Sequence, residues 1–271
     1  MEIISIVFLF FGAIWARRKP SNEKNWSLDQ KILPYSKFTK NEVRIFNIRN
    51  FKYTNEHDYE KRYYDKTFNL DNIKSVYYIL EPFRGIKGAA HTFLSFEFEN
   101  NEFIAISIEI RKKKGDKFSP IKGMFRKYEI MYVIGDEKDL IGLRANHRKD
   151  FVRVYPLKIS AGKTRALFLD MLNRANKLKE KPEFYNTITN TCLTNILKHT
   201  HKISGKKIPY SLKILLPEKS DHLLHKLGFI KTKLSLEKAR QRFLINKLAK
   251  KHASDPDFSV KIRASENTEQ I

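Results

Sequence analysis

The spacing of apolar residues changes once along this 271-residue chain, near Ser160, and that change restricts the fold more than any other feature. Before Ser160, short apolar runs typical of β-strands are separated by Gly, Asn and Asp clusters. These runs cover residues 42–48, 77–83, 91–98, 103–111, 129–134 and 152–156. After Ser160, apolar residues recur at helical spacing. Helices are predicted over 160–181, 192–203 and 235–252. Strands followed by helices indicate an α+β fold.

The charge is strongly basic, with 53 Lys and Arg against 30 Asp and Glu and a formal net charge of +23. Such a field attracts phosphate-rich partners, either nucleic acid or an anionic lipid surface. The chain has no helix-turn-helix, zinc-finger or RNP-type signature, and its basic residues are spread along its whole length. A solvated Lys-rich surface accounts for the charge at least as well, so we expect no specific nucleic-acid partner.

The N-terminus carries an apolar run of fourteen residues, 3–16, followed by Arg17, Arg18 and Lys19. This run is shorter than the ~20 residues that span a bilayer. It lacks the cationic start and the small-residue cleavage site of a signal peptide. We expect residues 1–19 to be a membrane anchor or signal-like segment. The basic residues after this segment would hold the domain on the cytoplasmic side of the membrane. A further membrane segment upstream would instead place the domain on the opposite side, so both orientations fit the sequence.

Cys192 is the only cysteine. Polar, cap-forming residues precede it and an apolar-periodic stretch follows, which places the thiol in the first turn of a helix. Unpaired backbone N–H groups and the helix dipole favour a thiolate there. A lone thiol cannot form an intramolecular disulfide, so it is either inert or reactive.

The runs 91–98 and 103–111 predict a β-hairpin whose polar face gathers possible partners for this thiol. Matching the two apolar faces requires an odd-length loop, such as residues 100–102. In that register Ser95 faces Ser107, His91 faces Arg111, and Glu109 lies diagonal to His91. A carboxylate beside an imidazole orients the ring and supports its positive charge. Cys192, His91 and Glu109 would then supply nucleophile, base and orienting acid.

An ordinary hairpin with a solvent-exposed polar face is the alternative, and the two interpretations are about equally balanced on pattern alone. The remaining histidines are weaker candidates. His199 and His201 follow Cys192 on its helix, and His222 and His225 share a later helical face. Neither pair has a suitably spaced third ligand, so we expect no metal and no cofactor.

The same residues resemble the Lnb N-terminal periplasmic domain family of bacteria, over about residues 20–230. The similarity rests on the segments around Trp26, Arg49-Asn50-Phe51, Tyr63 to Phe68, Ala90-His91-Thr92-Phe93, Ser107 to Arg111, Tyr185 to Asn195, Ile208-Pro209-Tyr210 and Leu215-Leu216-Pro217. The chain departs from the family pattern at Thr191, where Asn is more usual, and this leaves the cysteine in place.

The resemblance implies a circularly permuted papain-like (NlpC/P60-like) fold, an antiparallel sheet packed on helices, with the His strand before the Cys helix. It implies a Lnb-like catalytic domain over residues 20–252. It also implies a thiol-dependent acyltransferase at the inner membrane with a periplasmic catalytic domain. The composition of residues 253–271 separately predicts a disordered basic and polar tail.

In that interpretation, Cys192 takes an acyl chain from a phospholipid donor and passes it to the N-terminal amine of a lipoprotein acceptor. His91 acts as base, Glu109 orients it, and the Cys192 N–H with the Asn190 side chain holds the oxyanion. Ser95, Ser107 and Arg111 support the site, and the basic surface holds anionic headgroups.

Two other functions fit the same sequence. A cysteine hydrolase of the cell envelope, a peptidase or amidase, would use the same three residues with water as acceptor. A non-catalytic basic module would bind lipid or nucleic acid and carry an inert thiol. The apolar N-terminus favours lipid chemistry, because a soluble amidase needs no anchor.

Overall fold

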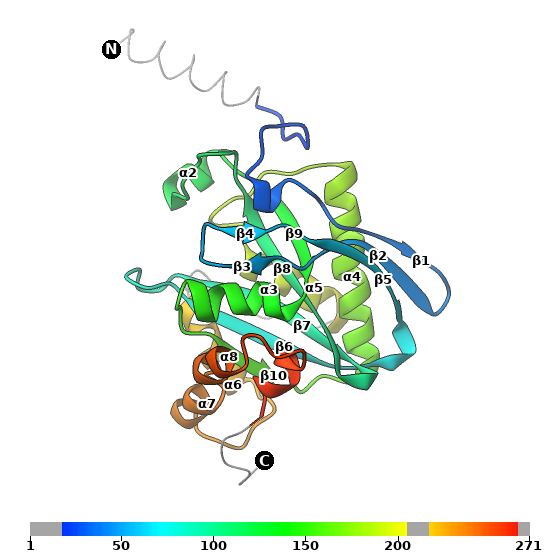
Figure 1. Ribbon diagram of the computed structural model, residues 1–271, viewed down its shortest axis with the longest axis vertical. Coiled ribbons are helices and arrows are strands. Elements are labelled where there is room, and N and C mark those ends of the chain that lie inside the picture. The colour runs from blue at the N-terminus through cyan, green and yellow to red at the C-terminus, as the bar shows by residue number, and fades with distance from the viewer. Residues whose placement is uncertain (1–17, 205–216, 265–271) are drawn as a thin grey trace.

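A computed structural model describes residues 18–204 and 217–264 of the protein. An eight-stranded sheet forms its centre, in the order β1-β2-β9-β8-β7-β6-β10, with β5 also paired to β2 (Figure 1). Its strands are β1 Tyr35–Phe38, β2 Glu42–Arg49, β5 Tyr63–Asn69, β6 Ile73–Pro82, β7 Ala90–Phe98, β8 Glu102–Arg111, β9 Glu129–Gly135 and β10 Arg153–Pro156. A separate two-stranded sheet joins β3 Lys52–Tyr53 to β4 Tyr59–Glu60. All six predicted strand runs are strands, and β1, β3, β4 and β5 are additional.

Helices cover both faces of this sheet, which makes the fold α+β as predicted. The α-helices are α2 Pro120–Met124, α3 Glu137–Gly142, α4 Ala161–Glu180, α5 Cys192–Ser204, α6 Ser220–Lys226, α7 Leu236–Arg242, α8 Asn246–Lys251 and α9 Phe258–Lys261. Short 3-10 turns lie at η1 Leu28–Gln30, η2 Leu70–Asn72, η3 Glu99–Asn101 and η6 Pro217–Lys219, and a π-helical turn at η4 Leu143–His147.

The expectation of a wholly antiparallel sheet is wrong at one position. Arg49 of β2 pairs with Gly135 of β9 in parallel, while the other strand pairs of this sheet are antiparallel. Parallel neighbours need a long connection between them. Here the chain from β3 to β8 supplies it, and the sheet is mixed.

Each face of the predicted hairpin packs on its own set of helices. The even positions Leu94 and Ile106 are buried in a cluster with α4 and α5, whereas the odd positions Phe93 and Ala105 are buried in a cluster with α3, α8 and α9. The exposed hairpin face considered above as the alternative is therefore absent, because the polar residues of that face lie in the interior.

The hairpin register differs by two residues from the predicted one. Phe98 pairs with Glu102 and Phe93 pairs with Ser107, around the three-residue turn 99–101. The turn begins one residue earlier than expected because Asn100 and Asn101 both adopt positive φ, which Asn tolerates better than most residues. A two-residue shift preserves the faces. Continued along the strands, it brings His91 opposite Glu109 instead of diagonal to it.

The C-terminal region departs further from expectation. The helix predicted over 235–252 is two short helices, α7 and α8. The tail expected to be disordered is ordered as far as residue 264, because Phe258 and Ile262 are buried in the α3 and α8 cluster. Residues 265–271 of that tail lie outside the described residues.

The predicted N-terminal anchor lies almost wholly at residues 1–17, outside the described part of the chain. Within residues 18–204 and 217–264, none of the helices has both the length and the apolar character needed to span a bilayer.

Candidate active site

Helix α5 begins at Cys192, as the sequence predicts. The Thr191 hydroxyl accepts from the Thr194 N–H at 3.2 Å and so caps the helix. The first N–H groups of any helix have no partner within it. Those of Cys192 and Leu193 are therefore suited to bind an oxyanion beside the thiol.

Ser107 connects His91 to Glu109. Its Oγ lies 2.7 Å from His91 Nε2 and donates to Glu109 Oε1 at 2.6 Å. Because the single hydroxyl proton goes to the carboxylate, the oxygen must accept from Nε2–H. Glu109 Oε1 also lies 3.2 Å from Nε2. Nε2 thus carries a proton, and Nδ1 is the ring nitrogen available for the hydrogen bond with the Cys192 thiol.

The charges of this group are mutually stabilising. Burial lowers the pKa of His91, but the Glu109 carboxylate and the hydrogen bond to Cys192 outweigh it and raise that pKa to about 10. For Glu109 burial acts in the opposite direction and raises the pKa. The charges of His91 and Arg144 outweigh burial and hold the pKa of Glu109 well below its ordinary value. An imidazolium between two acidic groups is the result.

Cys192 itself is partly buried. Burial raises the pKa of its thiol, whereas the hydrogen bond and charge of His91, with a smaller contribution from Thr92, lower it below the ordinary value overall. A depressed thiol pKa beside a cationic imidazole is the condition under which cysteine acts as a nucleophile.

Cys192, His91 and Glu109 line one cavity of about 200 Å³. It lies where β7 begins and β8 ends, which allows side chains from both sheet faces to reach it. Its wall carries both cations and acids. The cations are Arg49, Lys112, Arg144 and Arg148, and the acids are Asp29, Glu81 and Glu109. A polar substrate group next to a reactive thiol is what such a cavity accommodates.

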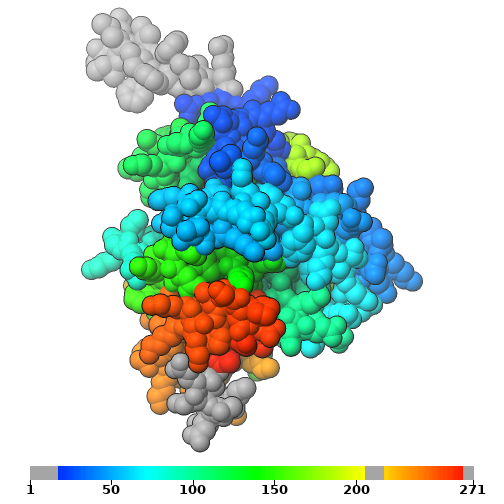
Figure 2. Space-filling view, in the orientation of Figure 1, coloured from blue at the N-terminus to red at the C-terminus, as the bar shows by residue number. Residues whose placement is uncertain are grey.

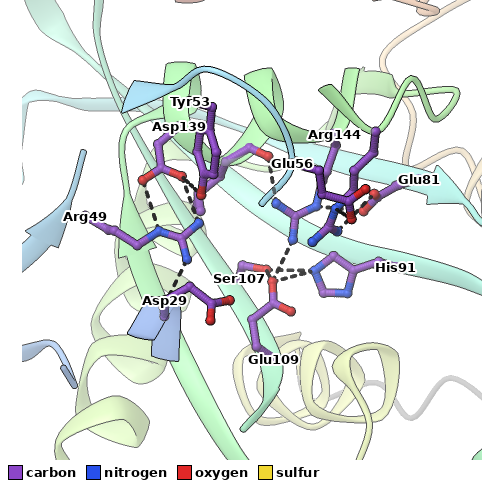
Figure 3. A network of polar contacts seen from close by, with 12 residues as sticks. Asp29, Arg49, Tyr53, Glu56, Glu81, His91, Ser107, Glu109, Asp139 and Arg144 are labelled. Carbon is purple, nitrogen blue, oxygen red and sulfur yellow. Dashed lines mark hydrogen bonds and ion pairs between the residues drawn. The ribbon is translucent and has the colours of Figure 1, made fainter. Parts of the chain in front are cut away.

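Arg144 is a member of the site that the sequence did not reveal. Its Nη2 donates to Glu109 Oε1 at 2.7 Å and its Nε to Glu81 Oε2 at 2.6 Å (Figure 3). It projects from the π-helical turn η4, whose irregular spacing hides its direction. The one sequence signal was Glu81, a carboxylate within the apolar run 77–83 that pairs with His91 across β6 and β7. A buried carboxylate requires a cation nearby.

A second buried ion pair forms another side of the site. Arg49 donates to both carboxylate oxygens of Asp139, at 3.0 and 2.8 Å, and to the Asp29 carbonyl at 3.3 Å (Figure 3). Asp139 also accepts from the Phe51 N–H at 2.8 Å. This pair fixes β2 and α3 against each other beside the cavity.

Three of the proposed supporting residues lie elsewhere. Ser95 is buried opposite Ala105, further along the hairpin. Arg111 stacks on Trp26 at 4.3 Å and donates to the Gln30 and Lys31 carbonyls, which fastens the N-terminal lead-in. The Asn190 amide donates to the Phe184 carbonyl and accepts from Asn195, each at 2.8 Å, and so orders the loop before Cys192. Only Ser107 of the supporting set joins Cys192, His91 and Glu109.

The other histidines make no metal site. His199 lies between Tyr132 and Asp170, at 2.7 Å from each, and His225 contacts the Leu234 carbonyl at 2.8 Å. Within the described ranges, no group of three or more His, Cys, Asp or Glu side chains is placed to hold a metal ion.

A protein-family model described as the Lnb N-terminal periplasmic domain matches residues 59–218, which include Glu81, His91, Ser107, Glu109, Arg144 and Cys192. No curated protein and no solved structure matches the chain. The family match covers more than half of the 271 residues. The chain therefore belongs to the Lnb N-terminal periplasmic domain family.

Proposed function

We propose that this protein is a thiol-dependent acyltransferase that moves an acyl chain from a phospholipid to the N-terminal amine of a lipoprotein. The observation that carries the proposal is the linked group Cys192–His91–Ser107–Glu109 at one cavity. The family, named for a periplasmic domain, supports a location at the periplasmic side of the inner membrane. The order of the His strand before the Cys helix supports a permuted papain-like arrangement.

In the first half-reaction, the Cys192 thiolate attacks the ester carbonyl carbon, and the backbone N–H groups at the start of α5 stabilise the oxyanion. The C–O bond breaks and the His91 imidazolium gives its proton to the leaving glycerol oxygen. The products are an acyl-thioester on Cys192 and a lysophospholipid. Glu109 and Ser107 keep the ring in position throughout.

In the second half-reaction, the amine of the acceptor attacks the thioester carbon. Neutral His91 accepts the amine proton, an amide bond forms, and the C–S bond breaks. The thiolate–imidazolium pair is thereby restored, and no other reactant is required.

An apolar cavity along the same helix supports an acyl substrate. It is lined by Leu193, Ile196 and Leu197 of α5, by Leu223 and Leu224 of α6, and by Tyr78. Burial raises the pKa of Tyr78, and the Cys192 charge contributes a smaller part. Apolar walls on the helix that begins at the nucleophile suit a hydrocarbon chain better than a peptide.

Intact-mass spectrometry of the full chain after incubation with phospholipid vesicles tests the proposal. We expect a single acyl adduct that hydroxylamine removes, that Cys192→Ala abolishes, and that an N-terminal lipopeptide discharges as an N-acyl product. Transfer by Cys192→Ala would refute it. Release of free fatty acid without N-acylation, or cleavage of envelope peptides, would identify a cysteine hydrolase instead.

A further inference from the structure

Helix α2 and the loop packed on it expose an unusual concentration of large apolar side chains. Phe118, Ile121 and Phe125 are 40%, 66% and 56% exposed, and Ile188 in the loop is 47% exposed. We call these four residues the α2 surface. Contiguous exposed apolar side chains mark an interaction site on a protein.

Positive charge surrounds the α2 surface. Residues 112–127 hold seven Lys or Arg and one acid, Asp116. That acid is paired with Lys127 at 2.9 Å. Lys113, Lys114, Lys117 and Lys122 are exposed. Apolar side chains that project among cations fit the boundary of an anionic bilayer, where the chains enter the acyl region and the cations meet phosphates.

The α2 surface adjoins the mouth of the Cys192 cavity. Phe118, Lys112 and Tyr185 belong to the wall of that cavity. The Lys114 N–H donates to the Asn25 carbonyl at 2.8 Å, which ties this region to the N-terminal lead-in. Figures 1 and 2 show α2 projecting at the end of the molecule where the described chain begins.

Helix α2 also contacts the loop that leads to the nucleophile. The Thr187 hydroxyl donates to the Pro120 carbonyl at 2.7 Å. Gly123 is packed so closely that a Cβ there would lie 2.4 Å from Thr187 Oγ1 and 3.0 Å from the Tyr185 ring. If the α2 surface binds lipid, these contacts would keep the loop before Cys192, and the cavity behind that loop, at the bilayer.

We propose that the α2 surface inserts into the anionic leaflet that supplies the acyl donor, and that it delivers the phospholipid ester to the Cys192 cavity. This inference rests on the proposed phospholipid substrate. The occupant is a lipid surface, because the cations of residues 112–127 match anionic headgroups and the one acid among them is already paired with Lys127.

A site-specific fluorophore on the full chain tests insertion without any chemistry. In a Cys192→Ser background, Ile121→Cys carries an environment-sensitive nitrobenzoxadiazole label. Leu227→Cys is the matched control, since Leu227 is a 47% exposed apolar residue directly after α6. Helix α6 lies away from α2 in Figure 1. Vesicles of phosphatidylcholine, with and without phosphatidylglycerol, are the probes.

We expect the label at 121 to shift to the blue, brighten and be quenched by lipid-borne quenchers on phosphatidylglycerol vesicles, while the label at 227 stays unchanged. No change at 121 on vesicle-bound protein would overturn the proposal. So would a response to a lipoprotein peptide or to protein concentration without vesicles, since either identifies a polypeptide occupant.

Activity separates this inference from the proposed function. With Ile121→Glu and Phe125→Glu together, we expect acyl-thioester formation about tenfold slower on vesicles, and unchanged with phospholipid in detergent micelles. Equal rates for the double variant and wild type on vesicles would contradict membrane insertion of the α2 surface, but not the acyltransferase activity. Absence of thioester from wild type in both media would contradict the acyltransferase itself.

Discussion

Arg144 Nη2 lies 2.7 Å from Glu109 Oε1, the same oxygen that accepts from Ser107 and faces His91. The guanidinium therefore holds the carboxylate that in turn holds the imidazole. The Arg144 Nε donates a hydrogen bond to Glu81, whose carboxylate has no exposed surface. One guanidinium thus contacts two acids, the fully buried Glu81 and the partly buried Glu109, behind the proposed catalytic group.

Replacing Arg144 by Met removes the cation that Glu81 and Glu109 share, and leaves Glu81 only Arg148, at 3.7 Å, and Glu109 only His91. We expect a loss of about 3–5 kcal/mol in unfolding free energy, measured by urea titration. Arg165→Met is the control, because its ion pair with Asp71 is largely exposed and is worth below about 1 kcal/mol. Equal small losses in both variants would show that Glu109 is not held by Arg144.

The thiol of Cys192 should react at lower pH than an ordinary cysteine. Its pKa is lowered by His91, and the pKa of His91 is raised to about 10, so thiolate and imidazolium coexist between the two values. Iodoacetamide alkylation is expected to stay fast below the ordinary thiol pKa of about 8.5 and to slow only at still lower pH. In His91→Ala the pH dependence of the alkylation rate should shift to higher pH. A wild-type profile centred on the ordinary value would indicate an inert, buried thiol.

Glu109→Gln is expected to change how stability depends on pH. The folded pKa of His91, about 10, lies above its unfolded value of about 6.5. The charged ring therefore stabilises the fold fully below about pH 6.5, and this contribution is lost as the pH rises toward 10. Because Glu109 is the main cause of the raised pKa, the variant should be less stable than its parent at pH 6, and the gap should narrow toward pH 10. The part of the gap that comes from the ion pair with Arg144 should remain.

Chemical denaturation at several pH values measures this gap, in a Cys192→Ala background that removes the thiol titration. This background also removes the part of the raised His91 pKa that Cys192 supplies, so the change should occur below pH 10. Glu102→Gln is the control, since Glu102 is on the same strand with an exposed side chain, paired to Lys66. A gap that is constant with pH in the Glu109 variant would contradict the coupling to His91.

The sequence predicted the hairpin faces and the helix start, and it failed on features set by distant contacts. Alternating Ile and Phe fix which face each residue takes, so His91, Ser107 and Glu109 were correctly grouped. The same alternation cannot distinguish registers two residues apart, and the positive φ of Asn100 and Asn101 decides between them. Arg144 was missed because its direction depends on a π-helical turn and its partners lie 35 and 63 residues away.

Phe258 tests the docking of the C-terminal segment, which composition alone had marked as disordered. Its side chain is 1% exposed and packs with α3 and α8. Phe258→Ala should cost about 3–5 kcal/mol in unfolding free energy. Phe151→Ala is the matched control, because Phe151 is 51% exposed and its truncation should change stability by less than about 1 kcal/mol. Comparable small losses would mean that the segment is undocked in solution.

Gly123 and Gly162 should respond in opposite directions to the same substitution. In Gly123→Ala the new Cβ would lie 2.4 Å from Thr187 Oγ1 and 3.0 Å from the Tyr185 ring, so α2 or the loop before Cys192 must move. We expect a loss of about 1–3 kcal/mol in unfolding free energy.

Gly162 lies in α4, has nothing within 4 Å of the Cβ position and needs no positive φ. Gly162→Ala should therefore gain about 0.4–1 kcal/mol. Urea unfolding of both variants measures the two effects, and a Gly123→Ala protein as stable as wild type would show that α2 does not pack on the Cys192 loop.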